Sequence, residues 1–347
     1  MRALQLTDWK HAPEFRDVDV PEPGPGEVLV RVGAAGACHS DLHLMNEFEE
    51  GMVPFGPPFT LGHENAGWVE ALGAGARGVE VGQPVAVYGP VGCGTCDRCL
   101  VGMENYCARQ AELTTFGPGL GSDGGMAPYL LVSDSRHLVP LGDLDPIEAA
   151  PLTDAGLTPY HAVVRSLDLL RPGSTAVAIG IGGLGHLGVQ ILRALAPSRI
   201  VAVDPRESAR RLALDAGADH AVAPGPDAAD EIREHSRGLG ADLVVDFVGN
   251  DGTLGLAVGV SRTHSQITVV GLGGGTYPLS FFSVPYEASV TTTYWGTIPE
   301  LREVVALAES GHIRAEISRH ALDDAPGVYE RLQRGEIDGR AVIVPEG

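Results

Sequence analysis

The stretch TAVAIGIGGLG, from Thr175 to Gly185, decides how the second half of the chain folds. Its first five residues are an apolar run that predicts a buried strand, and an apolar helical stretch follows the glycines. Between strand and helix lie the loop residues Gly180, Ile181, Gly182, Gly183, Leu184 and Gly185. Glycines in this context predict a dinucleotide site, because they allow a tight turn, close approach to a pyrophosphate and close packing of helix on strand.

Strands and helices alternate along the chain after this loop. Apolar runs predict strands at 200–203, 242–247 and 266–270, and helical periodicity covers 207–216 and 228–237. Alternation of this length predicts a parallel, doubly wound sheet. A glycine-rich turn in another α/β protein is the alternative to a dinucleotide site.

An acidic residue directly after the predicted strand 200–203 bears on the choice between NAD and NADP. Asp204 lies 19 residues after Gly185, where a carboxylate can accept hydrogen bonds from the adenosine ribose. The same charge would repel a 2′-phosphate, which favours NAD over NADP. Arg206, Arg210 and Arg211 stand close by in the sequence and could soften that repulsion.

The first part of the chain has a different sequence pattern, with short apolar runs broken by glycine and proline. Runs at 28–32, 67–72 and 85–88 predict strands of a mostly antiparallel unit. The pattern changes near Leu152, and a last strand at 340–344 is expected to return to the first unit. We therefore expect one domain from 1–153 with 298–347 and another from 154–297, which suits a chain of 347 residues.

Four of the five cysteines gather within 15 residues. They are Cys93, Cys96, Cys99 and Cys107. Four thiolates are the preferred ligands of a closed structural zinc site, so we predict a zinc lobe near 90–110. An iron–sulfur cluster is the alternative, because closely spaced cysteines bind one too. Such a grouping indicates metal binding in a reducing compartment, not a disulfide framework.

The fifth cysteine belongs to a second candidate metal site. Cys38 lies in the run CHSDLH, His63 lies in GHE, and Asp154 stands where the sequence pattern changes. A catalytic zinc takes three protein ligands and keeps one position open. Each residue also has a simpler interpretation, as a buried thiol, a hydrogen-bonded histidine or a helix-capping aspartate. The combination favours a zinc site.

Together these motifs resemble the zinc-containing medium-chain dehydrogenase/reductase family over essentially the whole chain, most closely the bacterial NAD-dependent secondary alcohol dehydrogenases. The resemblance implies a GroES-like, mostly antiparallel β catalytic domain and a Rossmann domain with a doubly wound parallel sheet. It also implies that Cys38, His63 and Asp154 hold a catalytic zinc, with Glu64 behind the metal and able to coordinate it transiently. Ser40 and His43 match the family's proton relay. Many members have cysteine where this chain has Asp154.

The resemblance extends to residues with less specific patterns. It implies that the cofactor is lined by Thr158, Phe247, Val248, Val270, Gly271 and Leu272, and that Arg340 lies near the pyrophosphate. It implies an apolar substrate pocket built from Phe55, Leu120, Tyr294 and Trp295, for which plain core packing is the alternative. One departure concerns Ala209, which stands where many members have a basic residue on the adenosine side.

The resemblance therefore predicts a zinc-dependent enzyme with two zinc ions per chain that transfers a hydride between secondary or primary alcohols and NAD. Other substrates for the same machinery are polyols, amino alcohols and formaldehyde conjugates, and the apolar pocket candidates argue against a polyol. A zinc-free quinone or enoyl reductase would not need the metal residues. A non-catalytic binding protein would not need a candidate for every catalytic role.

Composition limits partners and location. The formal net charge of −21 disfavours nucleic acid and anionic membranes. We find neither a secretory signal pattern nor an apolar run long enough to span a bilayer, so a cytoplasmic protein is expected. The family forms dimers and tetramers, and the hydrophobic stretch 281–285 is the candidate subunit contact.

Overall fold

Two units make up the structure, a computed structural model that describes residues 1–345. Unit 1 comprises Met1–Leu157, Trp295–Gly311 and Ala315–Gly347, and unit 2 comprises Thr158–Tyr294 with His312–Arg314. The last two residues of the first domain expected from the sequence lie outside the described residues.

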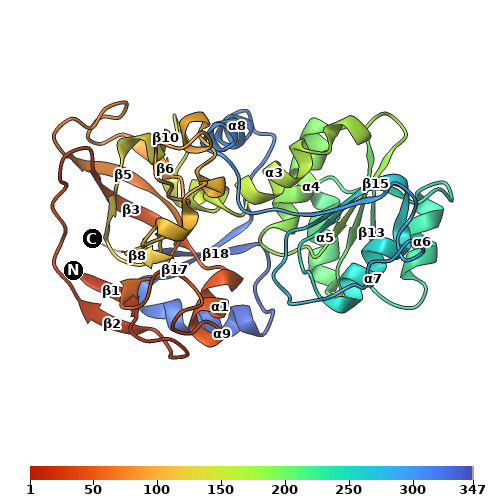
Figure 1. The fold of residues 1–347 in the computed structure, drawn as a ribbon, viewed down its shortest axis with the longest axis horizontal. Helices are drawn as coiled ribbons and strands as arrows, with labels where there is room; N and C mark the ends of the chain where they lie inside the picture. Colours follow the sequence, from red (N-terminus) through yellow and green to blue (C-terminus); the bar gives the residue numbers. More distant parts are fainter. Residues whose placement is uncertain (346–347) are drawn as a thin grey trace. The chain divides into compact units, whose positions relative to one another are not determined.

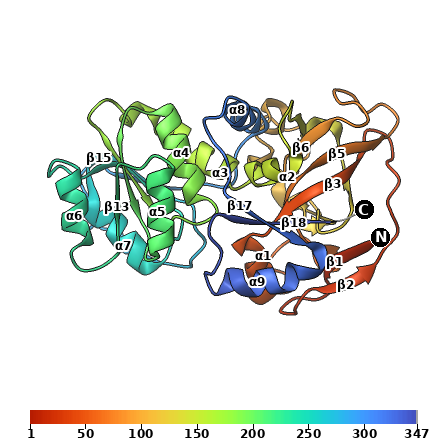
Figure 2. The same ribbon diagram turned by 180° about the vertical axis from the view of Figure 1, so that it is seen from behind.

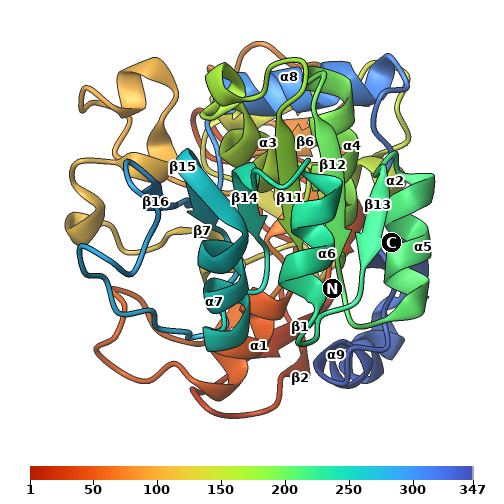
Figure 3. The same cartoon turned by 90° about the vertical axis from the view of Figure 1, so that its right-hand side faces the viewer.

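Unit 2 is built around a parallel sheet of six strands in the order β13-β12-β11-β14-β15-β16 (Figure 3). The strands are β11 (Thr175–Ile179), β12 (Arg199–Val203), β13 (His220–Val222), β14 (Ala241–Asp246), β15 (Ser261–Val269) and β16 (Ser289–Thr292). All neighbouring strands run parallel, which confirms the predicted sheet. The order reverses at β11, which has β12 on one side and β14 on the other. Such a reversal is where open α/β sheets bind ligands.

Unit 2 has one α-helix before β11 and four between its later strands. They are α3 (Leu157–Val164), which begins at the unit boundary, α4 (Gly185–Leu195), α5 (Glu207–Asp215), α6 (Ala228–His235) and α7 (Asp251–Val260). Helices α4 and α5 pack against each other and against the β11–β13 side, whereas α6 and α7 form a second packed pair. The glycine loop joins the end of β11 to the first residue of α4, so the amino terminus of α4 lies beside the loop.

Unit 1 is mostly antiparallel, as predicted. Its main sheet has the order β10-β6-β5-β3-β18-β17, with β9 paired to β3, and a smaller sheet has the order β2-β1-β4. The strands are β1 (Arg2–Leu6), β2 (Glu14–Asp17), β3 (Val28–Gly36), β4 (Phe59–Thr60), β5 (Glu64–Leu72), β6 (Pro84–Val87), β7 (Gly117–Pro118), β8 (Gly121–Ser122), β9 (Tyr129–Val132), β10 (Leu138–Pro140), β17 (Ile317–Ala321) and β18 (Arg340–Val344). Strand β18 pairs with β3 in the main sheet of this unit.

Four α-helices complete unit 1: α1 (His39–Asn46), α2 (Pro146–Ala149), α8 (Ile298–Glu309) and α9 (Ala325–Gln333). Helices α1 and α9 lie side by side although they are almost 300 residues apart in the chain (Figures 1 and 2). They share a core with Leu4, Leu61 and Ile343, into which α1 contributes Leu44 and α9 contributes Tyr329.

The longest helix is α8, with 12 residues. Across residues 1–345, no helix combines the length and the hydrophobicity needed to cross a membrane.

Candidate functional site

The four clustered cysteines converge in a loop of unit 1 between β6 and β7. Their sulfur atoms all lie within 4.8 Å of one another. The Cys96 and Cys99 sulfurs are 3.4 Å apart, which is far longer than the roughly 2.05 Å of a disulfide. The backbone N–H groups of Cys93 and Arg109 both donate to the Cys107 sulfur. This is the donor set of a closed tetrahedral zinc site.

The pKa values of these thiols differ widely, and a bound cation would lower the pKa of each thiol that it contacts. Hydrogen bonds from Thr95 lower the pKa of Cys93 to about 6, whereas burial raises the pKa of Cys99 to about 12. A bound dication is the largest local charge in such a site and stabilises every thiolate that contacts it. The residues therefore fit a structural metal.

A buried carboxylate fixes this lobe to the rest of unit 1. Glu104 lies between Cys99 and Cys107 in the sequence, and its side chain is 1% exposed. It accepts hydrogen bonds from the Gly92 N–H at 2.7 Å and the Arg136 Nε at 2.8 Å, and the His137 Nε2 lies 3.0 Å away. Burial raises the pKa of Glu104, but the contacts with His137, Gly92 and Arg136 outweigh it and lower the pKa overall.

The second cluster forms because β3 and β5 pair next to each other in unit 1. The register aligns Gly36 with Glu64, which brings the residue after β3 and the residue before β5 together. Cys38 lies two residues after β3 and caps α1, His63 directly precedes β5, and Asp154 follows the short helical turn Ala150–Thr153. One donor atom from each of Cys38, His63, Glu64 and Asp154 lies within 4.8 Å of the others.

The distances and charges in this cluster suit a zinc ion. The Asp154 Oδ2 is 3.9 Å from the Cys38 sulfur and 3.7 Å from the His63 Nε2. Zinc bonds of about 2.0 to 2.3 Å in a tetrahedron place donor atoms about 3.3 to 3.8 Å apart. Cys38, Asp41, Glu64 and Asp154 put four acidic groups in one largely buried region, which a cation would offset.

Glu64 is held by an arginine from β18. The Arg340 Nε donates to the Glu64 Oε2 at 2.8 Å, the Arg340 Nη2 contacts the Glu64 Oε1, and both side chains are almost fully buried. Burial raises the pKa of Glu64 to about 7, although Arg340 opposes the rise. The guanidinium thus contacts an acid of the metal cluster, and its role at the pyrophosphate remains a prediction.

Asp41 supports the cluster from behind and was not singled out from the sequence. Its Oδ1 lies 3.0 Å from the His63 Nδ1, and its Oδ2 accepts the Cys38 N–H at 3.1 Å. Burial lowers the pKa of His63, but the charge of Asp41 and hydrogen bonds to Asp154 and Asp41 raise it overall. Its place in the CHSDLH run, three residues after a proposed ligand, was the only available signal.

The two relay candidates lie on α1. The Ser40 Oγ is 3.6 Å from the Cys38 sulfur. The His43 Nδ1 is 2.8 Å from the Glu47 Oε1, and the His43 side chain is 23% exposed. The side chain of His43 therefore reaches solvent from α1, the helix that Cys38 caps. The relay itself remains a prediction.

The four predicted pocket residues have different surroundings. Trp295 is buried, donates its indole N–H to the Thr153 carbonyl at 2.9 Å, and meets the His63 ring edge-on at 5.5 Å. Phe55 packs in an aromatic cluster with Trp9, Phe59 and Phe116, against which Leu120 also packs. Tyr294 belongs to unit 2 and is partly exposed. Trp295 is thus the one with a described contact to the metal cluster.

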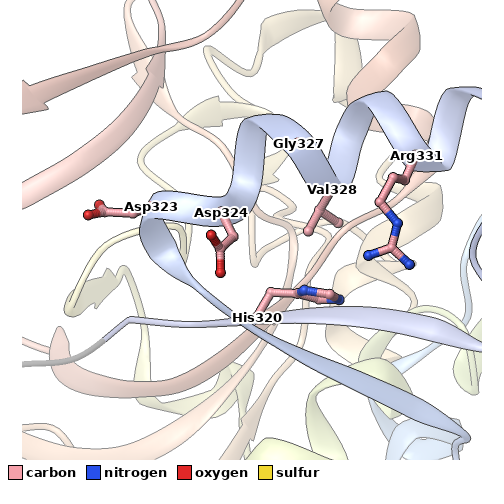
Figure 4. A pocket seen from close by; sticks show the side chains of 6 residues that line it. All are labelled: His320, Asp323, Asp324, Gly327, Val328 and Arg331. Atoms are coloured by element: carbon pink, nitrogen blue, oxygen red, sulfur yellow. The ribbon is translucent and has the colours of Figure 1, made fainter.

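A separate hollow of about 380 Å³ lies between β17 and α9 (Figure 4). It is lined by His320, Asp323, Asp324, Gly327, Val328 and Arg331. None of these lining residues belongs to either metal cluster, and the side chains of His320 and Arg331 face each other across it. The hollow is therefore not the predicted zinc site.

The glycines of the loop between β11 and α4 differ in how closely the protein surrounds them. A β-carbon on Gly185 would lie 1.9 Å from the Gly180 carbonyl oxygen, so the packing of α4 on β11 demands glycine there. Gly180 has a φ of +88°. In contrast, a β-carbon on Gly182 would meet nothing within 4 Å. No protein atom described at this loop therefore requires a glycine at 182, and its contact with a pyrophosphate remains a prediction.

Asp204 lies beside this loop at the end of β12. Its Oδ2 accepts the Ile181 N–H at 2.8 Å, and its Oδ1 accepts the Arg206 N–H at 2.9 Å. The Arg206 Nε lies 3.4 Å from the same Oδ1, and the Arg210 Nη1 donates to the Asp204 carbonyl. Two of the three nearby arginines therefore gather at Asp204.

Apart from Arg340, which belongs to unit 1, the other predicted cofactor residues lie in unit 2. Thr158 is buried at the start of α3. The Val248 side chain lies close to Gly180, and the Phe247 ring lies close to Gly188 in α4. Gly271 and Leu272 follow β15 with Val270, and Leu272 is exposed. Their contact with a cofactor remains a prediction.

Comparison with known proteins matches both units. Residues 24–143 match the model of the alcohol dehydrogenase GroES-like domain, and residues 183–310 match that of the zinc-binding dehydrogenase. The chain is 36% identical to a D-arabinose 1-dehydrogenase (NADP(+)) of Saccharolobus solfataricus, over 99% of this chain and 97% of that protein. It is 34% identical to an NAD-dependent alcohol dehydrogenase of Sulfurisphaera tokodaii, over 99% and 100%.

Solved structures agree with the sequence matches. The alcohol dehydrogenase of Aeropyrum pernix superposes with a TM-score of 0.91 at 35% identity, covering 99% of this chain and all of that one. Both domain types are therefore accounted for by one family. The chain belongs to the family of zinc-binding alcohol dehydrogenases with a GroES-like domain.

Proposed function

We propose that this protein is an NAD-linked zinc alcohol dehydrogenase that interconverts secondary or primary alcohols and the matching ketones or aldehydes. The observation that carries the proposal is the group of donor atoms from Cys38, His63, Glu64 and Asp154, all within 4.8 Å. One sulfur, one nitrogen and carboxylate oxygens suit a catalytic zinc that keeps a position open for substrate.

Within this proposal, the bound groups supply the reactive chemistry: zinc acts as a Lewis acid that lowers the pKa of the alcohol, and NAD⁺ accepts a hydride. The alcohol carbon loses the hydride and its oxygen loses a proton, so the products are a carbonyl compound, NADH and one proton. Cys38, His63 and Asp154 would hold the metal. Ser40 and His43 carry the proton toward solvent.

The loop residues of unit 2 bind the dinucleotide in this proposal. The open space at Gly182 leaves room for a pyrophosphate at the amino terminus of α4, where the helix dipole favours an anion. Asp204 accepts from the ribose and favours NAD. Arg206 lies against that carboxylate, so a measurable activity with NADP is expected as well.

The direct test combines metal content with turnover. We expect two zinc ions per chain and NADH formation from 2-butanol. Cys38→Ser should abolish turnover while NADH still binds, as seen by its fluorescence, because the glycine loop lies in the other unit. An active protein without zinc, or a Cys38→Ser variant with normal turnover, would contradict the proposal.

The substrate class is proposed to be apolar alcohols. The indole of Trp295 borders His63, which favours hydrocarbon groups over hydroxyl groups beside the metal. A sugar substrate is the second candidate, because one relative is named a D-arabinose 1-dehydrogenase. A panel of 2-butanol, 1-phenylethanol and D-arabinose at fixed NAD decides between them, and a higher kcat/KM for D-arabinose would reject the apolar assignment.

We also propose that the protein is a cytoplasmic homo-oligomer. Its unpaired cysteines suit a reducing compartment. Phe281 and Phe282 are 74% and 85% exposed, which is unusual for large apolar side chains. They precede β16, an edge strand of the parallel sheet, so a second copy is the expected cover.

A further inference from the structure

A tyrosine near the C-terminus contacts Asp41, the residue that hydrogen-bonds the proposed zinc ligand His63. Tyr329 lies on α9 and donates its hydroxyl hydrogen to the Asp41 Oδ2 at 2.8 Å. The two residues are 288 positions apart in sequence, and the hydrogen bond is buried. The contact therefore depends on the packing of α9 against α1.

Asp41 is the point where this contact meets the metal cluster. It is fully buried, and its two oxygens contact the His63 Nδ1, the Cys38 N–H and the Tyr329 hydroxyl. Of its two side-chain partners, the tyrosine is the one outside the proposed ligands. The imidazole Nδ1 of His63 is committed to Asp41, which leaves Nε2, 3.7 Å from Asp154, as the ligand atom.

The chemistry of Tyr329 suits a permanent donor. Burial raises the pKa of its hydroxyl well above the ordinary value, and the negative charge of Asp41 raises it further. The phenol therefore stays protonated and keeps its hydrogen for the carboxylate. With the Tyr329 hydroxyl on Oδ2, the carboxylate is held with Oδ1 toward the imidazole.

We propose that Tyr329 is a positioning residue for the zinc ligand His63 and acts through Asp41. The proposal rests on the proposed function, because it requires a zinc ion at Cys38, His63 and Asp154. Partners behind a metal-bound histidine fix its tautomer and ring orientation, and their loss typically costs about 10- to 100-fold in metal affinity. Tyr329 is one contact further out, so we expect the lower end of that range.

The matched control is a second buried tyrosine of unit 1. Tyr88 is 0% exposed, donates its hydroxyl hydrogen to the Gly296 carbonyl at 2.7 Å, and accepts the Asn105 N–H. Tyr88→Phe and Tyr329→Phe therefore delete the same atom from a buried, hydrogen-bonded position. Both should lower the thermal midpoint by similar amounts.

The experiment follows zinc release from the full-length holoenzyme into a chelator that reports colour. We expect Tyr329→Phe to speed the loss of the metal at Cys38 and His63 by about tenfold. In the same assay, Tyr88→Phe should leave that phase unchanged. In protein with cobalt at this site, Tyr329→Phe should shift the visible absorption bands and Tyr88→Phe should not. Equal release and equal spectra in the two variants would overturn the proposal and leave Tyr329 as a core residue.

A double-mutant cycle tests the route through Asp41. If Tyr329 acts on His63 by holding Asp41, then Tyr329→Phe should add little to the release rate once Asp41→Asn is present. Fully additive effects would contradict the proposal. A wild-type protein that has no metal at Cys38 and His63 would instead overturn the proposed function, so the two failures are distinguishable.

Discussion

At the scale of single residues, Gly182 can show whether a glycine is needed for ligand binding and not for folding. A β-carbon there meets no protein atom within 4 Å, whereas one on Gly185 would collide with the Gly180 carbonyl. We predict that Gly182→Ala leaves the thermal midpoint unchanged and weakens NADH binding about ten- to a hundredfold, since a methyl group in a tight contact costs about 1–3 kcal/mol. Fluorescence titration with NADH measures the affinity.

The control for this prediction is Gly255→Ala in α7, where a β-carbon also meets nothing within 4 Å. That variant should bind NADH normally. If Gly182→Ala bound NADH as tightly as wild type, the pyrophosphate would not approach the backbone at this loop.

His43 is the residue where the proton relay can be tested. We predict that His43→Gln keeps both zinc ions and binds NADH normally, but oxidises 2-butanol about ten- to a hundredfold more slowly, because a positioned base is lost. Added imidazole should restore part of the rate. The exposed His11 provides a control, since His11→Gln should change nothing. An unchanged rate and pH profile in His43→Gln would exclude the relay.

The sequence predicted which metal residues would gather, but not what supports them. Cys38, His63 and Asp154 stand out by residue type and by the motifs around them, and the structure brings them together. Tyr329 carries no such signal, because a tyrosine on an amphipathic helix is indistinguishable in sequence from an ordinary core residue. Its contact with Asp41 depends on packing between distant helices, which periodicity does not report.

At the scale of elements, the cysteine lobe depends on a buried ion pair as well as on its thiols. Glu104 is held by Gly92, Arg136 and His137, and replacing its carboxylate removes charge-assisted hydrogen bonds. We predict that Glu104→Gln lowers stability by about 2–3 kcal/mol and speeds zinc loss from the lobe. Scanning calorimetry and chelator kinetics measure both. Glu112→Gln, an exposed site in the same lobe, should do neither.

The Glu104 contribution should also depend on pH, with a definite sign. Its pKa in the folded protein lies below the ordinary value of 4.5. The carboxylate therefore contributes its full stabilisation above about pH 4.5 and loses it as the pH falls through the lowered pKa. The stability difference between wild type and Glu104→Gln should shrink on acidification below that value. A difference that stayed constant would mean that Glu104 is not ionised in the fold.

The strands of the parallel sheet were predictable where they were apolar and continuous, as in β11, β12 and β14. Helix α7 was not predicted, because Gly252, Gly255 and Gly259 disfavour a helix on local propensity alone. An Asn250 capping box and packing against β14 and β15 override that propensity. Helix α1 was missed for another reason, since its polar residues serve the metal cluster instead of an apolar stripe.

At the scale of the whole molecule, the residues proposed to bind metal and the loop proposed to bind NAD lie in different units. All proposed ligands of both metals belong to unit 1, and the glycine loop with Asp204 belongs to unit 2. Loss of metal should therefore leave nucleotide binding largely intact. The expectation of two domains rested on a change from short apolar runs broken by glycine and proline to alternating strands and helices.

The oligomer is the property that most depends on the whole surface. A protein with a formal net charge of −21 repels its own copies over long distances, so association needs a strong local attraction. Phe281 and Phe282 pack edge to face at 4.9 Å and are both largely exposed. They offer that attraction in the segment that precedes β16, an edge strand that can pair with the same strand of a second copy under two-fold symmetry.

We therefore predict that the wild-type protein is at least a dimer and that Phe281→Glu with Phe282→Glu makes it a monomer, as measured by multi-angle light scattering. Two new charges on each copy would meet their equivalents across the interface, which adds repulsion to the loss of apolar contact. Leu239→Glu is the control, because Leu239 is an exposed apolar residue of the same unit away from β16. A double variant that kept the wild-type mass, or a wild-type monomer at the same concentration, would place the subunit contact elsewhere or remove it.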